Sequence, residues 1–149
     1  MVAMSGKSIP YIGQILRKIR NMAHEGYPVR IYRTPVKRYC QILEIKDNLE
    51  LISLYKECHS KEKHWKEIRD GIRSVGILEM EMYILGNKVF MIVEAGLDFD
   101  WDEAMARLAS LPRQSEWEAF VSALQGCDSS ATSGQKWSLM ERMFYLYDD

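Results

Sequence analysis

The sequence contains no long apolar run. No stretch approaches the 18 or more consecutive apolar residues that a membrane-spanning helix needs. The N-terminal residues also lack the uninterrupted apolar segment of a secretory signal peptide. We therefore expect no membrane span and no membrane partner.

Cysteine is scarce, and neither sign of charge dominates the chain. The 149 residues include three cysteines, Cys40, Cys58 and Cys127, an odd number without the spacing of metal ligands. Free thiols in a reducing cytoplasm are the simplest interpretation, so we expect a cytoplasmic protein. The formal net charge of −1 gives no overall field that would attract nucleic acid, and we expect no nucleic-acid partner.

The motifs of several enzyme classes are missing. The sequence has no Walker-type phosphate loop, no G-x-G-x-x-G stretch and no nucleophile elbow. Cys58, His59 and His64 are too crowded for a structural zinc site, and no second cluster completes a set of four ligands. We therefore expect neither a metal site nor a cofactor.

Basic residues are concentrated at the N-terminus. Residues 1–38 hold eight Lys or Arg and one Glu, and an apolar stripe of helical spacing runs from Ile12 to Met22. Such a helix is typical of a transit peptide or of contact with an anionic surface, but a dispensable extension is the simpler interpretation. We divide the chain into an N-terminal extension, residues 1–35, and one domain, residues 36–149.

The domain begins with a strand and two helices. Residues 36–45 alternate as a strand, and residues 48–59 and 65–75 have helical periodicity. Gly76 is a typical C-terminal stop for the second helix. One face of the first strand is predicted to carry Tyr39, Gln41, Leu43 and Ile45.

A β-hairpin and two further helices follow. Gly86-Asn87 is a two-residue turn signal between strands at residues 77–85 and 88–95. Residues 98–125 are predicted to form two helices with Pro112 at their junction, the proline lying near the first position of the second helix. A polar loop precedes a last strand at Met143–Tyr147. One face of the hairpin is predicted to carry Leu78, Met80, Met82 and Ile84.

The predicted order of elements is β, α, β, β, α, β. This order is the split βαβ arrangement of the ferredoxin-like α+β fold. Its helices cover one face of the sheet, and the Tyr, Met and Phe residues on the other face need a cover. A second copy of the chain would supply one, so we expect a homodimer.

The joint between the first two helices brings candidate functional residues together. Tyr55 and His59 are four positions apart, which places a phenol and an imidazole on one helical stripe. Trp65 follows just after the joint and can supply an aromatic wall. The three side chains are consistent with a sugar-sized site, although without further support they are more often ordinary core-edge residues.

From Val36 onward the chain resembles the L-rhamnose mutarotase family. The resemblance rests on the KRYCQILEI strand, the Y-x-x-x-H pair Tyr55/His59 with Trp65 downstream, and the strand from Gly76 to Tyr83. The NKVFMIVE, LPRQSEWEAF and MERMFYL stretches complete it in the same order. It implies a dimeric α/β barrel that interconverts the α and β anomers of a 6-deoxyhexose such as L-rhamnose or L-fucose without a cofactor.

The resemblance also implies roles for individual residues. His59 and Tyr55 are expected to be catalytic, with the imidazole transferring the proton, because its ordinary pKa lies near neutrality. Trp65, Trp117 and Tyr83 are expected to bind the monosaccharide. The second acid/base group stays open, with Glu81 and Glu94 as candidates.

This sequence departs from the family pattern at several places. Lys66 stands where the family has proline, and only Trp117 remains of a tryptophan pair that the family has in its second half. An Asn-Pro-Asp-Asn-Ser-Pro loop is replaced by SSATSGQKW. The identity of the sugar therefore stays open. The alternative is a dimeric α+β barrel that binds or oxidises a hydrophobic small molecule, whose site should be larger and more apolar than a sugar site.

Overall fold

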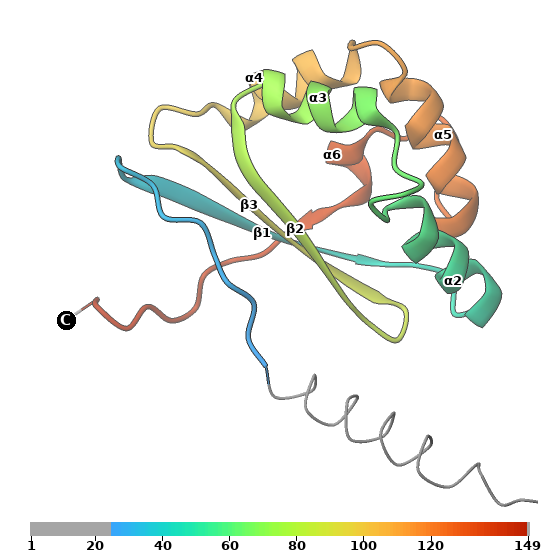
Figure 1. Ribbon diagram of the computed structural model, residues 1–149, viewed down its shortest axis with the longest axis horizontal. Helices are drawn as coiled ribbons and strands as arrows, with labels where there is room; N and C mark the ends of the chain where they lie inside the picture. Colours follow the sequence, from blue (N-terminus) through green and yellow to red (C-terminus); the bar gives the residue numbers. More distant parts are fainter. Residues whose placement is uncertain (1–24, 149) are drawn as a thin grey trace, which may run out of the picture. The chain divides into compact units, whose positions relative to one another are not determined.

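A computed structural model describes residues 25–148 of the chain (Figure 1). The chain divides into two units, residues 1–32 and residues 33–149. Residues 25–32 contain no helix or strand. The predicted N-terminal helix around Ile12–Met22 lies outside the described residues, and the boundary between residues 35 and 36 stays a prediction. None of the helices in the described part of the chain is long and apolar enough to cross a membrane.

The second unit contains one four-stranded sheet. Its strands are β1 (Val36–Glu44), β2 (Ile77–Leu85), β3 (Lys88–Gly96) and the short β4 (Ser138–Leu139), in the spatial order β2-β3-β1-β4. All three pairings are antiparallel, as the ferredoxin-like order predicts. The hairpin between β2 and β3 turns at Gly86 and Asn87, as predicted, and Gly86 has a φ of 61°.

The helices lie on one side of the sheet (Figure 1). α2 (Leu49–Cys58) and α3 (Lys66–Ser74) connect β1 to β2, whereas α4 (Trp101–Ala109), α5 (Gln114–Gln125) and α6 (Ser133–Lys136) connect β3 to β4. The α+β architecture with helices on one face is therefore as predicted. Asn48 caps α2 because its side chain accepts a hydrogen bond from Leu51 N, and Asp100 caps α4 in the same way.

Alternation along the strands places the core between sheet and helices. The odd-numbered residues of β3 are buried, and apolar partners of theirs on β1 and β2 pack into the same cluster. Gly76 ends α3 with a φ of 97°, a conformation that costs glycine little. The core face of the sheet carries Leu43, Met80, Met82, Ile84, Val89, Met91 and Val93.

The structure corrects the prediction for Leu78. A β-bulge between Ile77 and Glu79 shifts the register of β2 against β3. Ile77 therefore occupies the core position, and Leu78 is exposed. The extra residue reverses the side to which the first part of the strand points, which simple alternation does not reveal.

Three predictions for the second half of the domain were wrong. The last strand is Ser138–Leu139, whereas Met143–Tyr147 has no regular structure and leaves the sheet as a coil in Figure 1. The polar loop contains the short helix α6, which a capping box at Thr132 and Gln135 starts. α5 begins at Gln114 after Arg113, which has a φ of 65°, so Pro112 precedes the cap instead of opening the helix.

Candidate active site

Helix α2 holds Tyr55 and His59 together. Tyr55 is buried, and His59 is the half-buried residue that caps the C-terminus of the helix. The spacing of four residues brings the centres of their rings to 4.5 Å, with the ring planes inclined by 60°. The phenol and the imidazole therefore project to the same place, as the sequence predicts.

The hydrogen bond of His59 to its own helix selects one form of the imidazole. Its Nδ1 lies 2.6 Å from the carbonyl oxygen of Tyr55, which can only accept a hydrogen bond. Nδ1 therefore carries the hydrogen and Nε2 keeps a lone pair in the neutral ring. Nε2 has no hydrogen-bond partner among residues 25–148 and is the atom that can act as a base.

The surroundings of His59 favour this neutral form. Burial lowers the pKa of the imidazole below its ordinary value of 6.5, and the nearby Arg69 guanidinium lowers it further. The hydrogen bond to the Tyr55 carbonyl raises the pKa but does not outweigh the burial. The neighbouring Cys58 thiol is inert at neutral pH, because burial raises its pKa to about 11.

Aromatic side chains from α5 and from the joint before α3 pack around the imidazole. The ring of Trp117 meets His59 edge to face, with centroids 5.2 Å apart, and Trp65 meets Trp117 at 5.3 Å. Phe120 stacks on Trp65 at 5.6 Å. The guanidinium of Arg113 lies 4.2 Å from the centre of the Trp65 ring, a cation–π contact. Four of the five predicted site residues are thus in one cluster: Tyr55, His59, Trp65 and Trp117.

Tyr83 lies apart from this cluster. It is on the face of β2 that points away from the helices, since Met82 and Ile84 on either side of it pack into the core. Its hydroxyl donates a hydrogen bond of 2.5 Å to Glu81 on the same face. Alternation along the strand already predicts that Tyr83 lies on the face of the sheet away from the core side chains. The structure accordingly does not bring it to the imidazole.

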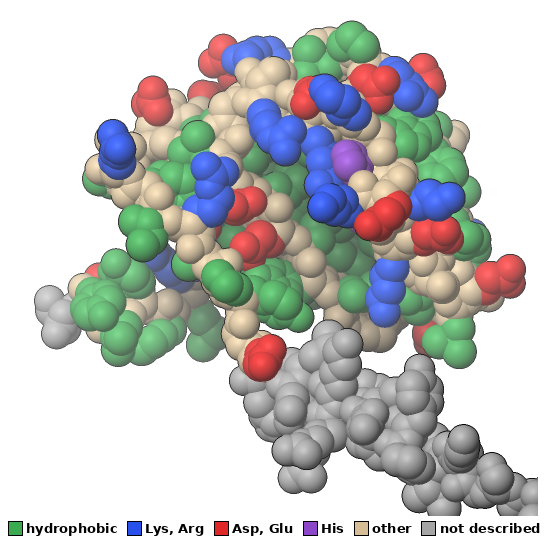
Figure 2. Space-filling model, in the orientation of Figure 1, with side chains coloured by type: hydrophobic (Ala, Val, Ile, Leu, Met, Phe, Trp, Pro, Cys, Tyr) green, Lys and Arg blue, Asp and Glu red, His purple; other side chains and the backbone are tan. Residues whose placement is uncertain are grey.

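Charged side chains surround the cluster on the surface of the helices. Arg113 forms ion pairs with Glu67 of α3 and Glu116 of α5, and Asp70 pairs with both Lys66 and Arg73. Figure 2 shows Lys and Arg side chains interspersed with acidic ones over this face. No site role was predicted for Arg113 or Phe120 from the sequence, because a charged residue in the first turn of a predicted helix and an apolar residue on its inner face are both ordinary features.

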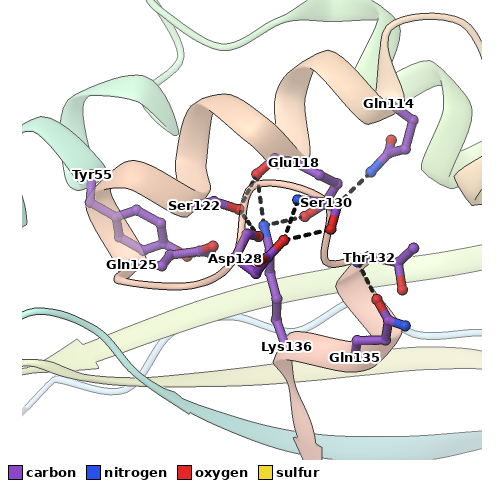
Figure 3. A network of polar contacts seen from close by, with 10 residues as sticks. All are labelled: Tyr55, Gln114, Glu118, Ser122, Gln125, Asp128, Ser130, Thr132, Gln135 and Lys136. Atoms are coloured by element: carbon purple, nitrogen blue, oxygen red, sulfur yellow. Dashed lines mark hydrogen bonds and ion pairs between the residues drawn. The ribbon is translucent and has the colours of Figure 1, made fainter.

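A second missed feature is a polar stripe on α5 that faces the interior (Figure 3). Gln114, Glu118, Ser122 and Gln125 are all buried, at the spacing of one helical face. The ammonium group of Lys136 reaches Glu118 from α6, with Nζ 2.7 Å from Oε2 and 2.8 Å from the backbone oxygen. The helical spacing of these polar residues was a usable signal in the sequence.

The interior end of this stripe meets the catalytic candidates. The amide Nε2 of Gln125 donates a hydrogen bond of 3.2 Å to the hydroxyl oxygen of Tyr55. The side-chain oxygens of Gln125 and of Gln41 on β1 are buried and have no hydrogen-bond partner. Burial raises the pKa of the Tyr55 phenol, which therefore stays protonated at neutral pH.

A separate hollow lies between α4, α5 and the loop before α6. Its lining includes Met105, Leu108, Gln114, Glu118 and Ser130. It does not include Tyr55 or His59. In the described part of the chain, no three His, Cys, Asp or Glu side chains are grouped so as to hold a metal ion.

Comparison with known proteins places the chain in a family. A model of the L-rhamnose mutarotase family matches residues 38–146. An L-fucose mutarotase from Xanthomonas campestris pv. campestris is 31% identical over 111 residues, which cover 74% of this chain and 89% of that protein. A protein from Dictyostelium discoideum, whose name states no activity, is 32% identical over 114 residues and is covered to 90%.

The fold also matches a solved structure. The crystal structure of an L-rhamnose mutarotase from Formosa agariphila aligns with a TM-score of 0.55 over 74% of this chain and 98% of that one. The two sequences are 18% identical, so this likeness concerns the fold alone. The family match over residues 38–146 and the identity to the L-fucose mutarotase show that the chain belongs to the L-rhamnose mutarotase family. Members of this family are enzymes that interconvert the anomers of a sugar.

Proposed function

We propose that this protein interconverts the α and β anomers of a 6-deoxyhexose such as L-rhamnose or L-fucose, with His59 as the group that moves the proton. The observation that carries the proposal is the state of the imidazole. Its Nδ1 hydrogen-bonds to the Tyr55 carbonyl 2.6 Å away, burial lowers its pKa, and its Nε2 is left to act as a base. Membership of the mutarotase family supports the choice of reaction.

The reaction needs proton transfer and one bond rotation. Nε2 of His59 takes the proton from the anomeric hydroxyl, the C1–O5 bond breaks, and the ring oxygen receives a proton from a second donor. Rotation about C1–C2 then presents the other face of the aldehyde, and the reverse transfers close the ring. A single positioned acid/base group contributes about 10²–10⁴-fold to such a reaction.

The aromatic residues would hold the sugar beside the imidazole. Trp117 meets His59 edge to face, and Trp65 lies behind Trp117 with Phe120 and Arg113 against it. Aromatic rings pack well on the apolar C–H faces of a sugar and exclude water from the opening ring. Tyr55 would hydrogen-bond a sugar hydroxyl, because its phenol stays protonated.

We further propose that the protein acts as a homodimer in a reducing cytoplasm. The face of the sheet away from the helices carries Ile42, which is 37% exposed and pairs with Phe90. A second copy packed on this face would remove such apolar side chains from water. The cysteines Cys40, Cys58 and Cys127 are all free thiols, as a reducing compartment requires.

The test is the rate of anomer exchange. Saturation-transfer NMR would be recorded on L-rhamnose, L-fucose and several other hexoses, with and without the purified protein. We expect faster exchange between the two anomeric signals of at least one 6-deoxyhexose and little effect on hexoses that keep the 6-hydroxyl. An absence of acceleration with every sugar would refute the proposed function.

A further inference from the structure

Helix α5 supplies the Tyr55 phenol with a partner from a distant part of the chain. Gln125 is 70 positions away in sequence, and its amide Nε2 donates a hydrogen bond of 3.2 Å to the phenol oxygen (Figure 3). Gln125 is 5% exposed and Tyr55 is 3% exposed. The contact therefore lies well inside the protein, where each polar group needs a partner.

Each of these two side chains has polar capacity left over. The Oε1 atom of Gln125 is buried without a hydrogen-bond partner. The hydroxyl of Tyr55 accepts from Gln125, and in the described part of the chain no acceptor takes its own hydrogen. A buried acceptor left unpaired costs about 1–3 kcal/mol, so this arrangement calls for a group that the protein itself does not supply.

The unmet capacity does not depend on how the amide is turned. With Nε2 on the phenol, the tyrosine hydrogen, the second amide hydrogen and the glutamine oxygen are left, which include a donor and an acceptor. With the amide reversed, the phenol donates to the oxygen, and the two hydrogens of the NH₂ group and the phenol oxygen are left, which again include a donor and an acceptor. A hydroxyl group is the complement in both cases, because it donates one hydrogen bond and accepts another.

The same pair lies beside the proposed base. The ring of Tyr55 is 4.5 Å from that of His59, measured between centroids, and His59 is the half-buried member of the group. The hydrogen-bonded pair is therefore next to the imidazole on which the sugar would react. We propose that Gln125 and Tyr55 form a subsite that binds one hydroxyl group of the sugar, and that Gln125 helps to determine which sugar is accepted. This inference rests on the proposed function.

Gln114 shows that a buried glutamine on this helix need not have such a role. It lies at the other end of the polar stripe, and its amide donates a hydrogen bond of 2.9 Å to Oε1 of Glu118. None of its buried atoms is left without a partner. The unpaired oxygen is therefore specific to the end of α5 that meets Tyr55, and Gln114 is the matched control.

The test combines a substitution with altered sugars. Binding of L-rhamnose, L-fucose and their monodeoxy analogues, each lacking one hydroxyl, would be measured by calorimetry on the wild type, Gln125→Met and Gln114→Met. We expect the wild type to bind one analogue about 10-fold more weakly than its parent sugar, as a site built for a hydroxyl rejects a ligand without it. Gln125→Met should bind the parent about 10-fold more weakly and lose this discrimination, whereas Gln114→Met should keep it.

The side-chain amide of Gln125 gives a second readout that does not require the variant to fold. Its ¹⁵N–¹H signals in the wild-type protein should shift when the sugar is added. The inference is overturned if these signals stay in place at saturating sugar, or if folded Gln125→Met still discriminates the same analogue. It is also overturned if no sugar binds, whereas binding with this discrimination but without anomer exchange would refute only the proposed function.

Discussion

At the scale of single residues, His59 owes its chemistry to the helix that it ends. The Tyr55 carbonyl, one turn earlier, holds Nδ1–H, and the absence of a further helical turn leaves the ring half-buried. Burial then keeps the imidazole neutral. A protonated ring would have no lone pair, and a rotated ring would not direct its lone pair at the anomeric hydroxyl, so the position and the ionisation state act together.

Replacement of His59 should abolish most of the activity. We expect His59→Asn to slow anomer exchange by about 10²–10⁴-fold, because it removes the one proposed base while keeping a polar side chain. Exchange would be measured by saturation-transfer NMR on protein that circular dichroism shows to be folded. His64→Asn is the matched control, since the Nδ1 of His64 also contacts backbone oxygens, those of Ser60 and Lys61. Wild-type exchange in a folded His59→Asn protein would contradict the assignment.

The lowered pKa of His59 also predicts how stability depends on pH. The unfolded imidazole binds a proton near its ordinary pKa of 6.5, whereas burial lowers the pKa in the folded protein. Below about pH 6.5 the unfolded state therefore binds more protons, and the free energy of unfolding should fall as the pH falls towards the folded pKa. Above that range the contribution is complete.

Denaturant unfolding at pH 7.5 and 5.5 tests this dependence. The free energy of unfolding of the wild type should drop more between the two pH values than that of His59→Asn, which has no imidazole at this position. Equal drops in the wild type and in His59→Asn would show that the folded protein does not oppose protonation of this residue. The same reasoning predicts that activity falls only at pH values below the ordinary range of histidine.

The sequence allowed only part of this site to be predicted. Tyr55 and His59 are neighbours on one helix, so their contact follows from spacing alone. Trp117 and Gln125 come from a helix more than fifty residues later. Their contacts with His59 and Tyr55 depend on how α5 packs against α2, which the local pattern does not contain. The resemblance to a family supplied Trp117, whereas the polar spacing along α5 includes Gln125 but does not identify Tyr55 as its partner.

At the scale of elements, a buried ion pair joins α6 to α5. Lys136 has a fully buried side chain, and both of its hydrogen bonds go to Glu118. Oε1 of Glu118 accepts from Gln114, and the hydroxyl of Ser122 reaches the backbone oxygen of Asp128 at 3.1 Å. These contacts connect the whole segment after α5 to the polar stripe of that helix (Figure 3).

Loss of Lys136 should destabilise the protein strongly. Lys136→Met leaves the Glu118 carboxylate buried without its counter-charge, and removing one partner of a buried pair typically costs about 3–5 kcal/mol. Lys66→Met is the control, because Lys66 pairs with Asp70 on the surface with 81% of its side chain exposed. Such an exposed pair contributes little to stability. Urea titration would measure both, and a loss below about 1 kcal/mol for Lys136→Met would show that the pair is not effectively buried.

The elements that could be predicted are those with a complete local signal. The β2–β3 hairpin has alternating strands and a Gly-Asn turn, and α2 and α4 have capping residues at their first turns. The segment Met143–Tyr147 is rich in the aromatic and apolar residues that strands favour, yet among residues 25–148 no strand pairs with the chain beyond Leu139. Strand formation depends on a partner that local pattern does not contain, whereas a helix satisfies its own backbone.

At the scale of the whole molecule, apolar side chains are exposed on more than the sheet face. The segment after β4 presents Met143 and Phe144 at 95% and 72% exposure. Single exposed apolar residues are normal, but a run of them left exposed among residues 25–148 points to a contact with another molecule. A second copy of the chain that covers the sheet would also lie within reach of this segment as it leaves the sheet edge at β4 (Figure 1).

A charge on the open face of the sheet should therefore prevent dimer formation. Ile42→Lys places an ammonium group among the apolar side chains that the second copy would cover, and an unpaired buried charge opposes association. Leu54→Lys is the control, because Leu54 is 44% exposed on α2, on the helical side of the sheet. Light scattering at micromolar concentration should give twice the mass of one chain for the wild type and Leu54→Lys, and a single mass for Ile42→Lys. A wild-type monomer with full activity would contradict the dimer, and a dimeric Ile42→Lys protein would place the interface elsewhere.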